Sequence, residues 1–94
     1  MVASKQSKRS PNPVPRRGGA SYSAPALEKG LDILEQLGYG GQAQSLLQLA
    51  SSLGRSPSEI YRMLEVLVDR GYLKRRNSTF TLTLKLFELG MQSL

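Results

Sequence analysis

The sequence contains no cysteine and no histidine among its 94 residues. Without cysteine, no disulfide bond can support the core, and without histidine the chain lacks the commonest zinc ligand and general base. Its acidic residues are spread along amphipathic segments and have no converging nucleophile or base. We therefore expect no metal, no cofactor and no enzymatic activity.

Long apolar runs are missing as well. No segment approaches the run of about 18 apolar residues that a transmembrane helix requires, and the polar N-terminus lacks the apolar middle part of a secretory signal. We therefore expect a soluble, cytoplasmic protein with no membrane partner. The length allows one small domain, which buries only about 60–65% of the surface that the unfolded chain exposes.

Basic charge is concentrated at the N-terminus. Residues 1–22 hold five basic residues and no acid, whereas residues 23–94 hold eight basic residues against seven acids. The first segment is rich in serine, proline and glycine, so we interpret it as a disordered arm that cannot bury enough apolar area to become ordered. The arm either adds non-specific attraction to phosphates or reaches into a minor groove, or it is a soluble leader that makes no specific contact. The leader is favoured because basic charge alone carries no sequence information.

Two short helical patterns open the ordered part of the chain. The first begins near Ser23, shows leucines spaced three or four residues apart, and ends where Gly38 opens the stretch "GYGG". The second is about two turns long. In it Ser45 and Gln48 fit a capping box, and Gly54 ends the helix.

The third helical pattern carries the strongest local signals. Ser56 fits an N-cap, Pro57 the first helical position and Glu59 the capping-box position, and the helix ends at Gly71. At about 100° per residue, one face is apolar and the opposite face is polar. The apolar face comprises Ile60, Met63, Leu64 and Leu67. The polar face comprises Ser58, Arg62, Glu65 and Asp69. One face should pack, and the other should remain free.

Two β-like runs follow this helix. They are separated by Asn77 and Ser78, a pair suited to a turn, and they predict a hairpin with three basic residues near its tip. The last segment, residues 84–94, has Leu84, Phe87 and Met91 at helical spacing. It therefore resembles an amphipathic helix without a partner.

Together these elements predict a mainly α fold with a small β-hairpin, a winged helix-turn-helix. Its architecture is a three-helix core, a wing and the start of a linker helix. A helix of ordinary diameter fits the major groove of B-DNA, about 12 Å wide, so its polar face can meet base edges. Lysine and arginine on the wing can meet phosphates, which adds affinity without sequence preference.

At these residues the chain resembles the N-terminal DNA-binding domain of the IclR family of bacterial transcription regulators. The similar segments are "LEKGLDILEQL", "SLLQLASSLGRSPSEIYRMLEVLVDRGYL" and "FTLTLKLFELG". The resemblance implies homodimers on a pseudo-palindromic operator, and a C-terminal domain, absent here, that binds a small effector. It implies a winged helix-turn-helix domain at 23–83, with the helix-turn-helix at about 45–70 and the wing at about 72–83, and a linker or dimerisation helix at 84–94.

Three positions depart from the family pattern. Thr83 stands where many members have glycine, and Pro57 and Glu59 stand where lysine and threonine are frequent. An acid at position 59 weakens the expectation of a phosphate contact there. Glu59 either serves the helix cap or accepts a hydrogen bond from a cytosine amino group, and the serine at position 56 favours the cap.

Most of the expected DNA contacts come from the third helix, the turn before it and the wing, and two come from the earlier helical segments. For Arg62 the family implies a DNA contact, and the alternative is pairing with Glu65 or Glu59, which would be weak. Tyr61 either touches a phosphate or covers the edge of the core, and Lys29 lies either near the DNA backbone or on a solvated face. The predicted contact residues are Lys29, Ser45, Arg55, Ser56, Ser58, Glu59, Tyr61, Arg62, Lys74, Arg75, Arg76 and Asn77.

The sequence thus favours sequence-specific binding of double-stranded DNA, as the DNA-binding domain of a regulator. A winged helix that contacts an acidic protein partner is the alternative. The two functions differ in their response to salt and to competing DNA.

Overall fold

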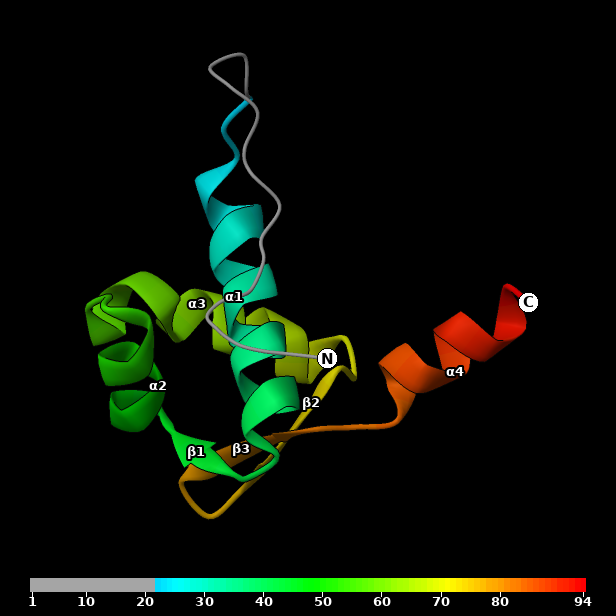
Figure 1. The fold of residues 1–94 in the computed structure, drawn as a ribbon. Helices are drawn as coiled ribbons and strands as arrows, with labels where there is room; N and C mark the ends of the chain where they lie inside the picture. Colours follow the sequence, from blue (N-terminus) through cyan, green and yellow to red (C-terminus); the bar gives the residue numbers. More distant parts are fainter. Residues whose placement is uncertain (1–21) are drawn as a thin grey trace.

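A computed structural model describes residues 22–94, and the predicted arm at 1–22 lies outside this range apart from Tyr22. Three helices pack together, a small sheet closes one side of them, and a fourth helix projects away (Figure 1). The elements in chain order are α1 (Pro25–Gly40), β1 (Gln44–Ser45), α2 (Leu46–Leu53), α3 (Pro57–Asp69), β2 (Leu73–Arg76), β3 (Thr79–Leu82) and α4 (Lys85–Gln92). The predicted mainly α, winged helix-turn-helix fold is confirmed.

The first helix begins near Ser23 and ends within the glycine-rich stretch at residues 38–41, as predicted. Pro25 occupies its first turn, where the missing N–H of proline costs nothing. The helix ends at Gly40, and Gly41 adopts the left-handed conformation (φ 69°) and donates its N–H to the Leu37 carbonyl at 3.0 Å. Gly38 lies inside α1, and the helix ends within the predicted glycine-rich stretch at residues 38–41.

Both predicted capping boxes are present. In α2, the Gln48 N–H donates to Ser45 Oγ at 3.2 Å, and the Ser45 N–H donates to Gln48 Oε1 at 2.8 Å. In α3, the Glu59 N–H donates to Ser56 Oγ at 3.3 Å, and the Ser56 N–H donates to Glu59 Oε1 at 2.9 Å. These bonds satisfy backbone donors that a helix start otherwise leaves without partners.

The core lies where the three helices meet the sheet. Each of α1, α2 and α3 contributes two buried side chains, and the hairpin contributes one from each strand. The buried residues are Ile33, Leu37, Leu49, Ala50, Ile60, Leu64, Leu73 and Phe80. The apolar face predicted for α3 is therefore the packed face.

The sheet has a strand that the sequence did not predict. Its order is β1-β3-β2, with antiparallel neighbours, and Gln44 of β1 pairs with Phe80 of β3. A strand of two residues is too short for alternation to show in the sequence. The predicted hairpin is confirmed, with Leu73 opposite Leu82 and the turn at Asn77, which adopts φ 58°.

The fourth helix leaves the body of the molecule. None of its residues is buried, and Figure 1 shows it extending away from the three-helix core. Leu84, Phe87 and Met91 are exposed, as the amphipathic pattern predicts for a helix without a partner. Within residues 22–94, no helix is both long enough and apolar enough to cross a membrane.

The position of Leu64 generates a stability prediction. Its side chain is 0% exposed and lies in the α3 face that meets the core. Leu64→Ala should lower the free energy of unfolding by about 2–5 kcal/mol, because it removes buried carbons and leaves a cavity. Leu47→Ala removes the same group from a site that is 68% exposed and should cost far less. Denaturant unfolding followed by circular dichroism measures both, and equal losses would contradict the assigned core.

Candidate nucleic-acid interface

The exposed face of α3 follows directly from its capped start. Because Ile60 and Leu64 are buried, the helix rotation is fixed, and Tyr61 and Arg62 between them point outward. The residues of this face in the first two turns are Ser58, Glu59, Tyr61 and Arg62, all of which are exposed. Tyr61 is 52% exposed, so about half of its surface faces solvent.

Arg62 carries the free positive charge of this face. Glu59 uses Oε1 for the helix cap, and the Glu65 carboxylate pairs with Arg75. The ion pairs within residues 22–94 therefore leave Arg62 without an acidic partner, and the alternative pairing with Glu65 or Glu59 is not formed. Its guanidinium remains available for a ligand.

The start of α3 concentrates hydroxyl groups. Ser56 Oγ accepts the Glu59 N–H and lies 3.2 Å from Ser58 Oγ. Glu59 serves the cap, which confirms that interpretation of its acidic side chain. Ser56 and Ser58 are both exposed at this helix start.

The wing, residues 73–82, divides its cations between two faces. Strand alternation places Arg75 on the same face as buried Leu73, and it places Lys74 and Arg76 on the other. Thr81 and Thr79 are the cross-strand partners of these two outward cations. The sequence suggested three equivalent basic residues, and the structure separates one of them from the other two.

Arg75 is already engaged within the protein. Its guanidinium pairs with the Glu65 carboxylate of α3 and lies 5.2 Å from the centre of the Phe80 ring. Both partners of the ion pair keep about 40% of their side-chain surface exposed, so the pair is weak and competes with solvent. It links α3 to the wing, and it reduces the charge that Arg75 can offer to a ligand.

Arg55 in the turn is also engaged. Its Nη2 lies 3.4 Å from Asp32 Oδ2 of α1, and its Nε is buried without a hydrogen-bond partner in the described part of the chain. The sequence pattern does not reveal this pair, because its partners are 23 positions apart. Arg55 therefore holds the turn against α1, and a phosphate contact would use its remaining donors.

The remaining predicted contacts come from three elements. Lys29 is half-buried on α1, and Ser45 uses its hydroxyl to cap α2. Asn77 forms the tip of the wing, with its left-handed backbone next to Arg76. The predicted contact residues of α3 and of the wing thus lie on adjoining elements, which the ion pair between Glu65 and Arg75 connects. Lys29 and Ser45 lie on other elements, α1 and β1.

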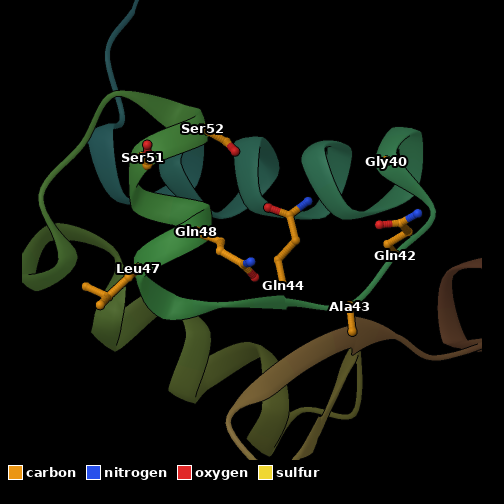
Figure 2. A pocket seen from close by; sticks show the side chains of 8 residues that line it. All are labelled: Gly40, Gln42, Ala43, Gln44, Leu47, Gln48, Ser51 and Ser52. Atoms are coloured by element: carbon orange, nitrogen blue, oxygen red, sulfur yellow. The ribbon is translucent and has the colours of Figure 1, made fainter.

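A shallow hollow of about 580 Å³ lies elsewhere, between the end of α1, the following loop and α2 (Figure 2). Its lining is uncharged: Gly40, Gln42, Ala43, Gln44, Leu47, Gln48, Ser51 and Ser52. None of the predicted contact residues lines it. Within residues 22–94 no group of three or more acidic, histidine or cysteine side chains could hold a metal ion.

A three-helix core with a capped third helix and a β-hairpin wing defines the class of winged helix-turn-helix proteins. The model of the IclR helix-turn-helix domain matches residues 26–77, more than half of the chain. The chain therefore belongs to this family, and the resemblance found in the sequence is confirmed.

Solved structures agree with this assignment. HmgR of Pseudomonas aeruginosa is 26% identical over 74% of this chain and 30% of its own, with a TM-score of 0.64. An IclR family transcriptional regulator from Brucella abortus is 20% identical over 87% of this chain and 35% of its own, with a TM-score of 0.68, which shows a shared fold. This chain thus spans about a third of each bacterial protein.

A viral domain shares the same architecture. The Zα domain of Cyprinid herpesvirus 3 ORF112, whose binding to Z-DNA has been described structurally, is 29% identical over 61% of this chain and 95% of its own, with a TM-score of 0.56. No curated protein sequence is a match.

Proposed function

We propose that this protein binds double-stranded DNA in a sequence-specific manner, as the DNA-binding domain of a bacterial transcriptional regulator. One observation carries the proposal: a capped, packed α3 presents exposed Tyr61 and Arg62, which has no acidic partner within residues 22–94, beside a cationic wing. Membership of the IclR helix-turn-helix family supports it.

In this proposal α3 enters the major groove of B-DNA. The groove is about 12 Å wide and exposes a distinct donor and acceptor pattern for each base pair. Arg62 can donate two hydrogen bonds to one guanine, and the Tyr61 hydroxyl can reach a phosphate or a base edge. Burial of the opposite helix face fixes the direction from which these side chains approach.

The wing supplies affinity without sequence preference. Lys74 and Arg76 point outward from β2, so both can meet phosphates without giving up an ion pair. Each neutralised phosphate releases counterions, which makes binding strongly dependent on salt. Arg75 contributes less because it must first leave Glu65.

Left-handed DNA is a second candidate ligand, and the likeness to a Z-DNA-binding viral domain over 95% of that domain favours it.

One experiment separates B-form DNA, left-handed DNA and an acidic protein as candidate ligands. Selection of bound sequences from random B-form duplexes, followed by salt titration on the selected and a scrambled duplex, should enrich a defined sequence. Preference for a Z-form duplex, with no enrichment, would favour recognition of DNA shape. No DNA binding at all would favour the acidic protein partner.

We further infer that two copies bind one operator. The apolar face of α4 is exposed and reaches the end of the described chain, and a small domain gains stability by covering such a face. Two-fold pairing would present two copies of α3 to half-sites about 10 bp apart, or a multiple of that distance. A small-molecule effector domain outside this sequence stays a prediction from the family resemblance.

Arg62→Ala should reduce affinity for the selected duplex far more than affinity for the scrambled duplex. An arginine contact with a base is worth about 1–3 kcal/mol of discrimination. The fold should survive, because the side chain is exposed and has no partner in the described residues. Fluorescence anisotropy on both duplexes measures the two affinities, and an equal loss on both would assign Arg62 to the phosphate backbone.

The wing cations should differ in their salt response. Arg76→Ala should flatten the slope of log affinity against log salt concentration by about 0.9, the value for one lost phosphate contact. Arg75→Ala should flatten it less, because Glu65 already neutralises this guanidinium. Titration from low to moderate salt gives both slopes. If Arg75→Ala has the larger effect, the division of the wing into two faces is wrong for the bound state.

Assembly can be tested on the apolar face of α4. We expect a concentration-dependent dimer in sedimentation equilibrium, and tighter binding to a two-fold site than to a half-site. Phe87→Glu should weaken both effects, since Phe87 is 64% exposed on this helix. Leu47→Glu, at an exposed apolar site of α2, is the matched control. A strict monomer that binds full sites and half-sites equally well would refute the dimer.

A further inference from the structure

The direction in which α4 leaves the body is set at a single joint. From Leu86 onward its side chains are exposed, and Figure 1 shows the helix extending away from the core. In the described part of the chain, the hydrogen bonds that connect residues 83–94 to the body all come from Thr83 and Lys85. A helix that is attached only at its start takes its direction from the bonds at that start.

Thr83 forms the first half of the joint. Its N–H donates to the Tyr72 carbonyl at 3.0 Å. Its hydroxyl lies 2.6 Å from the Gly71 carbonyl oxygen and 3.2 Å from that of Tyr72, and it accepts the Lys85 N–H at 3.2 Å. The hydroxyl therefore connects the end of α3 to the first N–H of α4, whose N-cap residue, Leu84, offers no side-chain cap.

Lys85 forms the second half. Its ammonium group donates to the Arg70 carbonyl at 2.8 Å and lies 4.9 Å from the centre of the Tyr72 ring. Arg70 is the C-cap of α3. Free carbonyl groups give this helix end a partial negative charge, so a cation is favoured there. The first residue of α4 is thus bonded directly to the end of the helix that presents Arg62.

Neither residue supports the core. Thr83 and Lys85 are half-buried, and both are absent from the buried cluster around Ile60 and Leu64. We therefore expect their hydrogen bonds to affect the angle between α3 and α4 and to contribute little to the packing of either helix. Loss of these bonds should leave the helix-turn-helix intact and release α4.

We propose that Thr83 and Lys85 are positioning residues that fix the direction of α4 relative to α3 and thereby set the half-site separation the protein accepts. The second part rests on the proposed pairing of two chains on one operator. If α4 joins the two copies, the angle at the joint determines how far apart the two α3 helices lie. If the joint were flexible, the two α3 helices could bind half-sites at several separations.

The absence of cysteine allows a direct test of the joint. Spin labels are attached at Glu35→Cys and Gln92→Cys, exposed positions on α1 and at the end of α4. Double electron–electron resonance then gives the distribution of label distances, with labelled chain diluted in a large excess of unlabelled chain. We expect one narrow distribution for the parent chain. Combining Thr83→Val with Lys85→Gln should broaden it, with an unchanged circular dichroism spectrum.

Two matched controls isolate the joint. Thr81→Val removes a hydroxyl from the same strand region, where it forms no side-chain hydrogen bond in the described residues. Arg70→Gln removes a positive charge at the α3 end and keeps the carbonyl that Lys85 uses. Both should leave the distribution narrow. A broad distribution in the parent chain, or a narrow one in the combined variant, would overturn the proposal.

DNA with varied spacing tests the functional part. The selected half-site is placed in two-fold duplexes whose separations differ by single base pairs around one helical turn. The parent chain should prefer one separation, and the combined variant should lose this preference while binding a single half-site within about twofold of the parent, because the changes lie outside the DNA contacts. A parent chain indifferent to separation would overturn the half-site role. The proposal that two chains pair would be refuted as well only if sedimentation equilibrium also found a monomer.

Discussion

Burial of one side of α3 is the constraint on which the rest of the structure depends. Ile60 and Leu64 lose all contact with solvent, and each comes one turn from the other, so the helix can neither rotate nor slide without exposing both. The capping box fixes where this helix begins. Every side chain on the opposite face therefore has a determined direction. A surface that recognises one arrangement of atoms needs such rigidity, because an adaptable surface would spend binding energy on becoming ordered.

The wing shows how strand alternation divides side chains that appear equivalent in sequence. Three consecutive basic residues follow Leu73, and the middle one is turned toward α3 by the two-residue period of the strand. There it meets Glu65 and the Phe80 ring. The wing consequently has an inner cation that braces it against the helix and two outer cations that face solvent. The division follows from backbone geometry alone.

Features encoded by neighbouring residues were predictable, and features that join distant residues were not. Both capping boxes, the hairpin turn at Asn77 and the buried face of α3 depend on positions within a few residues of one another, so they appear in the sequence. The two-residue β1 and the pairing of Asp32 with Arg55 depend on tertiary packing. The exposure of Tyr61 and Arg62 on α3 was likewise predictable, but the pairing of Arg55 with Asp32 and of Arg75 with Glu65 was not.

Ser45 belongs to two elements at once. It pairs with Thr79 in the sheet, and its side chain caps α2. Thr79 in turn donates its hydroxyl to the Arg76 carbonyl at the wing tip, at 3.0 Å. A strand pairing and a helix cap that share Ser45 therefore connect the wing directly to the first turn of α2.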